Sequence, residues 1–355
     1  MTRQKKIPGQ TPPLRLLFWE STTRCNLACA HCRRIETAEE ASREDLTTAE
    51  FRRVLDSCAS LGNPIIIFSG GEPLMRDDWD VLAAHAQALG LPTALATNGT
   101  LIDDALARRI ARAGFRRVSV SLDGADDATH DAFRRVDGAF QAAQAGIAAL
   151  RAADVPVQVN ATIAAHNDGQ LDRIYDMTRK IGAEALHLFL LVPVGCGMEI
   201  GESHQLPAKR YEQVLEWVLD RQEDGDLELK ATCAPHYYRL AAQRHAETGS
   251  DVSGGLASRH GRGCMCGVSV AFVSHKGEVF PCGYLPVHCG SVREQPFAEI
   301  WRNSEVFEKL RDYEALLGKC GRCEYKSVCG GCRARAYAMT GNYLAAEPAC
   351  TYCPK

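Results

Sequence analysis

The sequence has no long apolar run, no export signal and no excess of charge of one sign. No stretch reaches the roughly 18 consecutive apolar residues of a membrane-spanning helix, so we expect no membrane insertion. Residues 1–10 are polar and lack the apolar core of a signal peptide, which predicts a cytoplasmic protein. Lys and Arg (41) nearly balance Asp and Glu (44), which leaves a net charge of −3 and no basic footprint for nucleic acid. The 355 residues suffice for one large domain or two ordinary ones.

Cysteine is abundant, with 16 residues. Thiols of a protein that is not exported are expected to stay reduced, so metal binding explains them better than disulfides. One group lies near the N-terminus and a larger one fills the last quarter of the chain, while Cys58, Cys196 and Cys233 stand apart. The distribution predicts at least two metal centres, one at each end.

The first group, Cys25, Cys29 and Cys32, has C-x3-C-x2-C spacing and follows the apolar run 14–20, which is typical of a strand. Three thiolates on one loop can hold three irons of a [4Fe–4S] cluster and leave the fourth iron open for a substrate or cofactor. A structural zinc site is the alternative, with His31 as a conceivable fourth ligand. Zinc, however, prefers four closed ligands from paired C-x2-C arms.

Between residues 14 and 195, apolar runs alternate with amphipathic helical segments. Six such units predict an α/β fold with a parallel sheet, because parallel strands need crossover connections. Six units are too few for a closed eight-stranded barrel, so we expect a partial (β/α)6 TIM-like barrel with its active site at the carboxyl ends of the strands. The expected strands are 14–20, 64–69, 92–97, 117–122, 156–163 and 186–194.

Small polar residues and glycines follow three of these strands. They lie in the segments 69–73 (Ser-Gly-Gly-Glu-Pro), 97–99 (Thr-Asn-Gly) and 121–124 (Ser-Leu-Asp-Gly). Glycines let a backbone approach a ligand, and Glu72 with free carbonyls can receive an ammonium group. Each segment alone is better explained by an ordinary strand-to-helix turn, which Asn, Asp and Gly favour.

Together, in this order, these motifs resemble the core of radical S-adenosylmethionine (radical SAM) enzymes over residues 14–195. The resemblance implies that Cys25, Cys29 and Cys32 bind a cluster whose open iron is chelated by S-adenosylmethionine (SAM). The expected SAM contacts are the family's GGEP segment (Gly70, Gly71, Glu72, Pro73), Asn98, Ser121 and Asp123 near the ribose, Asn160, and Arg134 as partner of the carboxylate. His31 departs from the pattern, which usually has an aromatic residue before the third cysteine.

The segment 196–255 connects the barrel to the cysteine-rich region. We expect a helix over 205–220, a short strand or turn over 224–230, and a flexible boundary over 250–263. His236, Tyr237 and Arg239 combine cations with aromatic faces that suit a large anionic aromatic substrate, although an amphipathic surface helix starting at Pro235 explains them equally well. The expected domains are a tail (1–13), the barrel (14–195), this connecting or capping region (196–255) and a small cysteine-rich domain (256–355).

The C-terminal cysteines can form two interleaved four-cysteine sites, for which structural zinc is a serious rival to iron–sulfur clusters. Their arrangement resembles the SPASM extension of radical SAM enzymes, which carries two auxiliary [4Fe–4S] clusters, except that Cys329-x2-Cys332 is one residue shorter than the common pattern. The resemblance implies three clusters in all. By position, the outer auxiliary cluster would be bound by Cys320, Cys323, Cys329 and Cys350, and the inner one by Cys264, Cys282 and Cys332, with its fourth ligand open among Cys266, Cys289, Cys233 or the substrate.

The segments 232–236, 283–297 and 329–337 extend the resemblance to the heme-biosynthesis branch of SPASM proteins, and most closely to the heme b synthases of the siroheme-dependent pathway. It implies oxidative decarboxylation of two propionates of Fe-coproporphyrin III to vinyl groups, with electrons from a small flavodoxin or ferredoxin. Arg239, Arg333 and Arg335 are candidate partners for the carboxylates.

Other functions remain open. A sister enzyme could remove side chains from another tetrapyrrole such as didecarboxysiroheme. A peptide-maturing SPASM enzyme would share every cysteine, but such enzymes typically recruit the peptide through an N-terminal winged-helix-like domain, and only thirteen residues precede the first expected strand. A non-catalytic zinc or redox scaffold is the alternative from another class.

Overall fold

The computed structural model describes residues 11–34, 39–223, 225, 227–248 and 263–355, so most of the expected boundary at 250–263 lies outside the described residues. All six expected barrel strands are present, each shorter than its apolar run. The described strands are β1 (Leu16–Glu20), β2 (Ile65–Ser69), β3 (Thr93–Thr97), β4 (Val118–Ser121), β5 (Val157–Ile163), β6 (Ala185–Leu190), β7 (Glu228–Thr232), β8 (Val270–Val273), β9 (Glu278–Phe280) and β10 (Gly290–Ser291).

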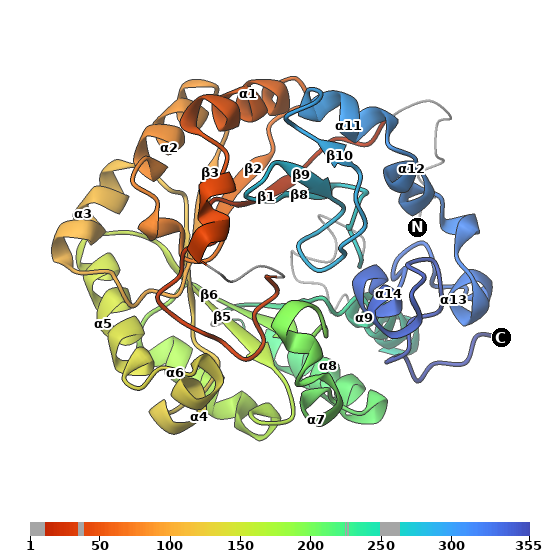
Figure 1. The fold of residues 1–355 in the computed structure, drawn as a ribbon. Helices are drawn as coiled ribbons and strands as arrows, with labels where there is room; N and C mark the ends of the chain where they lie inside the picture. Colours follow the sequence, from red (N-terminus) through yellow and green to blue (C-terminus); the bar gives the residue numbers. More distant parts are fainter. Residues whose placement is uncertain (1–10, 35–38, 224, 226, 249–262) are drawn as a thin grey trace.

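These described strands form one ten-stranded sheet in the order β10-β9-β8-β1-β2-β3-β4-β5-β6-β7. Strands β1 to β7 pair in parallel in chain order, as successive βα units require. The sheet extends beyond the six expected strands at both edges. Strand β7 continues it past β6, and β8, from the cysteine-rich region, pairs in parallel with β1 (Figure 1). The C-terminal region is therefore built onto the barrel sheet.

Helices cover the outer face of the sheet (Figure 1). Helix α1 begins with the expected capping box, in which Thr47 and Glu50 each accept a hydrogen bond from the other's backbone. The described helices are α1 (Thr48–Ala59), α2 (Trp79–Ala88), α3 (Asp104–Arg112), α4 (Asp127–Arg134), α5 (Ala139–Ala152), α6 (Leu171–Lys180), α7 (Gly201–His204), α8 (Ala208–Glu223), α9 (His236–Thr248), α11 (Phe297–Asn303), α12 (Glu305–Arg311), α13 (Gly318–Arg322) and α14 (Arg333–Thr340).

Two expectations for the connecting region need correction. The helix expected over 205–220 starts only at Ala208, because Pro207 holds the preceding residue out of the helical conformation. The charged segment expected over 224–230 forms strand β7 slightly later, at Glu228–Thr232. The helix expected after Pro235 is confirmed as α9.

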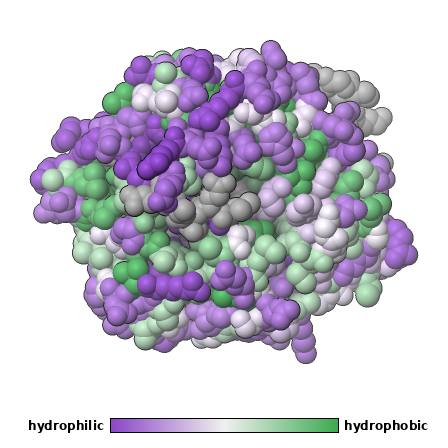
Figure 2. All heavy atoms as spheres, viewed as in Figure 1, coloured by the Kyte–Doolittle hydropathy of each residue, from purple (hydrophilic) through white to green (hydrophobic). Residues whose placement is uncertain are grey.

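The main core lies between the sheet and these helices. Trp19 of β1 stacks on Phe51 of α1 with ring centroids 3.4 Å apart, and Phe68 of β2 meets both rings edge-on. Alternate residues of β2 are only half-buried, because they face the interior of the open barrel. Hydrophilic side chains gather over the helices at the top of the view in Figure 2, as expected for amphipathic helices. No helix among the described residues has the length and apolarity to cross a membrane.

Candidate functional site

The loop after β1 carries Cys25, Cys29 and Cys32, all partly exposed. Backbone hydrogen bonds hold the loop in place: Ala30 donates to Phe133 at 3.0 Å, and Cys196 donates to Cys32 at 2.8 Å. The first bond ties the loop to α4 and the second to the segment after β6. The three cysteines therefore lie at the carboxyl ends of the strands, as expected.

Two arginines approach these thiols. Arg34 Nε donates to Cys32 Sγ at 3.3 Å, and Arg134 Nη1 donates to Cys29 Sγ at 3.6 Å. Burial raises the pKa of Cys25 and Cys29, while the two guanidinium groups act in the opposite direction. Positive charge beside the sulfur atoms suits thiolates that bind a metal cluster.

The Gly-Gly-Glu-Pro loop after β2 lies directly against the chain that enters the cysteine loop. Gly71 N donates to Thr22 O at 2.7 Å, and Glu72 N donates to Arg24 O at 2.8 Å. A Cβ at Gly71 would lie 2.2 Å from Arg24 O, so only glycine permits this approach. The loop thus positions the cysteines and keeps its own backbone at the barrel mouth.

Glu72 does not offer a free carboxylate. It is fully buried and accepts hydrogen bonds from Thr97 Oγ1 (2.8 Å), Asn98 N (2.8 Å) and Leu74 N (3.2 Å). Burial raises its pKa to about 7 despite these donors. The carboxylate of Glu72 thus joins the loops after β2 and β3, and its contact with an ammonium group stays a prediction. Backbone carbonyls remain for a ligand.

The other expected SAM contacts converge on the same end of the barrel. Asn98 Nδ2 donates to Asn26 of the cysteine loop at 2.8 Å, while Ser121 and Asn160 face each other across β4 and β5. Arg134 Nη2 lies 2.5 Å from Asp123 Oδ2.

Asp123 is fully buried, and burial opposes its ionisation, yet the positive charge of Arg134 lowers its pKa to about 2. His31 Nε2 lies 3.7 Å from the same carboxylate, and burial lowers the pKa of His31 to about 3. The His31 ring stacks on Phe133 with centroids 4.1 Å apart, so this histidine packs as an aromatic residue would.

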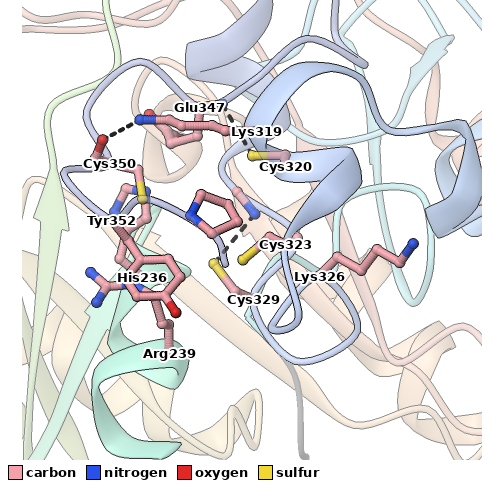
Figure 3. Close-up of a pocket in the computed structure, with 13 residues that line it drawn as sticks. His236, Arg239, Lys319, Cys320, Cys323, Lys326, Cys329, Glu347, Cys350 and Tyr352 are labelled. Atoms are coloured by element: carbon pink, nitrogen blue, oxygen red, sulfur yellow. Dashed lines mark hydrogen bonds between the residues drawn. The ribbon is translucent and has the colours of Figure 1, made fainter. Parts of the chain in front are cut away.

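Four C-terminal cysteines line one cavity that is partly open to solvent, which we call the outer cavity. Cys320, Cys323, Cys329 and Cys350 come from α13, from the loop after it and from the C-terminal segment (Figure 3). Backbone N–H groups already point at two of the sulfurs, from Glu347 to Cys320 (3.3 Å) and from Gly331 to Cys329 (3.5 Å). Four thiols with N–H donors around such a space fit an iron–sulfur cluster. We call these four residues the outer cysteine group.

A second set of cysteines packs together in a small core beside the outer group. We call it the inner cysteine group: Cys233, Cys264, Cys266, Cys282 and Cys332. A hydrogen bond with Cys266 lowers the pKa of Cys264, whereas burial raises the pKa of Cys266. Cys289 lies apart. It packs against the main core, and its thiol donates to Val287 O at 3.5 Å.

Cys233 belongs to the inner group although it follows β7, far from the others in sequence. Its backbone is left-handed (φ 57°), a conformation that is unusual for a residue other than glycine. The carbonyl accepts hydrogen bonds from Tyr211 at 2.9 Å and from Arg335 at 3.2 Å. These bonds hold the loop after β7 against the C-terminal cysteines.

A larger cavity of about 120 Å³ lies between the cysteine loop and the inner group. We call it the central cavity. Arg33 and Arg34, directly after Cys32, line one side, and Cys282 to Pro286 line the other. Arg33 Nη1 lies 3.4 Å from Glu20 Oε1, and its guanidinium covers the Phe272 ring at 4.4 Å. The cavity thus combines two arginines, the carboxylates of Glu20 and Glu278, aromatic faces and one cysteine, Cys282.

The residues suggested as substrate contacts lie elsewhere. His236 and Arg239 border the outer cavity, and the Tyr237 hydroxyl donates to Gln222. Arg333 donates to the carbonyls of Tyr343 (3.0 Å) and Ala345 (2.8 Å). Arg335 is fully buried and pairs with Glu347 at 3.5 Å. Neither of these two arginines lines the central cavity.

Sequence reasoning did not single out Arg33, Phe272 or Tyr284, which line the central cavity. Arg33 had one available signal, its position directly after the third cysteine. The other two could not be assigned, because only the pairing of β8 with β1 brings them to the barrel mouth.

The radical SAM superfamily model matches residues 19–178, and the model of the SPASM iron–sulfur cluster-binding domain matches residues 264–333. The chain is a radical SAM enzyme with a SPASM domain. Its cofactors are accordingly SAM and iron–sulfur clusters. This radical SAM enzyme is 48% identical to an AdoMet-dependent heme synthase of Methanosarcina barkeri over 96% of the chain and 97% of the relative.

A second relative from the same organism, an Fe-coproporphyrin III synthase, is 32% identical to this radical SAM enzyme over 94% of the chain and 87% of the relative. Among solved structures, Streptococcus suis SuiB bound to a precursor peptide superposes with a TM-score of 0.74 at 16% identity, covering 96% of this chain and 76% of SuiB. That likeness shows the fold alone.

Proposed function

We propose that this enzyme converts two propionate side chains of Fe-coproporphyrin III to vinyl groups and so forms heme b. The observation that carries the proposal is the central cavity, which offers Arg33 for a carboxylate and Phe272 and Tyr284 for an aromatic macrocycle. The 48% identity with an AdoMet-dependent heme synthase over nearly the whole chain supports it. We expect a flavodoxin- or ferredoxin-type protein to supply electrons.

Three [4Fe–4S] clusters are proposed: the SAM cluster on Cys25, Cys29 and Cys32, an inner auxiliary cluster on the inner cysteine group, and an outer one on the outer cysteine group. The placement of Cys289 against the main core leaves Cys233 and Cys266 as candidates for the fourth inner ligand. With SAM bound, this set would supply a 5′-deoxyadenosyl radical for hydrogen abstraction and an acceptor for one electron.

The residues of the chain position the substrate for this chemistry. Arg33, held by Glu20, would bind a propionate. A vinyl group would form when the propionate side chain loses a β-hydrogen atom to the SAM-derived radical, carbon dioxide, and one electron to an auxiliary cluster. The walls formed by the cysteine loop and by residues 282–286 would keep water from the radical.

The proposed domains are the barrel (14–195), a connecting region (196–255) and the SPASM domain (256–355), which shares the barrel sheet through β8. The second candidate function is that of a sister tetrapyrrole enzyme, because an Fe-coproporphyrin III synthase matches at 32% identity. The higher identity to the heme synthase favours the first.

The proposal is tested by anaerobic incubation of the reconstituted protein with SAM, a reductant and Fe-coproporphyrin III, followed by mass spectrometry. Loss of two carboxyl groups with heme formation supports it, and Cys25→Ala should abolish both. If 5′-deoxyadenosine forms while the porphyrin stays unchanged, the substrate is wrong. Incubation with didecarboxysiroheme then tests the sister function.

A further inference from the structure

His236 is a buried histidine whose ring packs edge-on against Tyr211, with centroids 5.1 Å apart. Only 2% of its surface is exposed, and neither ring nitrogen has a hydrogen-bond partner among the described residues. Leaving a buried polar group without a hydrogen-bond partner is destabilising, so such a group indicates a missing partner. Burial lowers the pKa of His236 to about 4, which keeps the ring neutral with one N–H donor.

Arg239, one helical turn later on α9, is also a buried residue with a nitrogen atom that lacks a hydrogen-bond partner among the described residues. It is 3% exposed, and its terminal nitrogens donate to Gln243 (2.6 Å) and to Glu212. Its Nε, however, has no hydrogen-bond partner among the described residues. Residues three apart share one face of a helix, so both donors belong to the same side of α9.

That side of α9 borders the outer cavity, together with the four thiols of the outer cysteine group (Figure 3). Arg239 lines this cavity together with Cys323 and Cys350. The central cavity, by contrast, has no lining residue in common with the outer one. These side chains therefore face the outer cysteine group and not the proposed substrate.

We propose that His236 and Arg239 are positioning residues that donate N–H···S hydrogen bonds to a cluster on the outer cysteine group and raise its reduction potential. A reduced cluster carries one more negative charge than an oxidised one, so hydrogen-bond donors and positive charge stabilise the reduced state more. The inference rests on the proposed function only in that the outer group holds a cluster, and it is independent of the substrate.

The test is an anaerobic redox titration followed by electron paramagnetic resonance (EPR). It uses the full chain carrying Cys25→Ala, Cys29→Ala and Cys32→Ala, so that only auxiliary clusters contribute. Adding His236→Phe, which keeps an aromatic ring but removes the N–H, should lower one midpoint potential. A tenfold decrease in the equilibrium constant for one-electron reduction corresponds to a decrease of about 59 mV in the midpoint potential. His236→Gln should restore part of the shift.

Tyr238→Phe on the same helix is the matched control and should shift neither midpoint. An unchanged pair of midpoints in His236→Phe overturns the inference while leaving the clusters in place. Zinc in place of iron on the outer group would overturn the cluster assignment as well as the inference. The metal content therefore distinguishes this outcome from a failure of the inference alone.

A second readout covers the case in which His236→Phe loses the outer cluster. Pulsed EPR of the reduced chain labelled with ¹⁵N-histidine should show a weak ¹⁵N coupling, transmitted through the hydrogen bond. If no such coupling is found in the protein with an intact His236, the inference is wrong.

Discussion

At the scale of single residues, Arg33 and Arg34 are adjacent but have different tasks. Arg34 is turned toward the cysteine loop, where it bonds Cys32 Sγ and the carbonyl of Thr23. Arg33 is turned toward the central cavity and is held there by Glu20 at 3.4 Å. Arg33 is therefore the arginine that we propose for a substrate carboxylate.

We predict that Arg33→Ala raises the KM for Fe-coproporphyrin III at least about tenfold, because a charge-assisted hydrogen bond contributes roughly 1.5–3 kcal/mol. Arg33→Lys should recover part of the loss, since it keeps the charge but not the planar fork. The measurement is steady-state kinetics of heme formation, with the exposed Arg173→Ala as control. A KM that does not change in Arg33→Ala would assign the carboxylate to another residue.

Gly71 gives a prediction about assembly. Gly71→Ala would place a methyl group 2.2 Å from Arg24 O and so push the loop after β2 away from the cysteine loop. We expect this variant to lose the SAM cluster, and with it 5′-deoxyadenosine formation, while the auxiliary clusters remain. Iron content and 5′-deoxyadenosine yield measure the two effects. Gly169→Ala, where a Cβ meets nothing within 4 Å, is the control, and equal iron content in both variants would refute the prediction.

Glu72 gives a prediction about pH. Its folded-state pKa of about 7 lies above the ordinary 4.5, so the native state binds more protons between these values and its stability falls as pH rises through this window. The shift corresponds to about 3 kcal/mol. Glu72→Gln removes this titration. The Tm of the wild type minus that of the variant should therefore be larger at pH 5 than at pH 8, and a constant difference would contradict it.

At the scale of elements, Arg335 at the start of α14 joins three parts of the chain. It donates to the carbonyls of Leu190 (3.2 Å) and Leu191 (3.1 Å) after β6 and to Cys233 after β7, and it pairs with Glu347 in the C-terminal segment. Arg335 and Glu347 are both fully buried. The pair fixes the inner cysteine group against the barrel.

We predict that Arg335→Met destabilises the protein by about 3–5 kcal/mol, because it leaves the Glu347 charge buried with only the backbone N–H groups of Cys332 and Ala349 as partners among the described residues. Adding Glu347→Gln to Arg335→Met should recover part of the loss. The measurement is anaerobic urea unfolding of the three proteins, followed by circular dichroism. A double variant that is less stable than the single one would show that Glu347 is stabilised by other groups.

At the scale of the whole molecule, one sheet carries both cysteine regions. Strand β1 leads into the loop with Cys25, and its neighbour β8 leads toward Cys282. Because β1 and β8 are parallel and adjacent, the segments that follow them leave the same end of the sheet, and the central cavity lies between those segments. A substrate held there would have the SAM cluster on one side and the inner cysteine group on the other.

Much of this arrangement could be predicted from the sequence. The apolar runs of β1 to β6 and the cysteine spacings are local signals, and the structure confirms the barrel. The edge strands of the sheet were harder to predict, because β8 has only four residues and two of the five residues of β7 are charged. The placement of His236 could not be predicted, because helical periodicity does not tell which of two cavities a face of α9 borders.

The central claim is that a propionate β-hydrogen is removed by the SAM-derived radical in the central cavity. The most direct measurement uses Fe-coproporphyrin III deuterated at the propionate β-carbons and mass spectrometry of the 5′-deoxyadenosine formed. We predict one deuterium in 5′-deoxyadenosine for each vinyl group produced. Heme formation with 5′-deoxyadenosine free of deuterium would contradict the account.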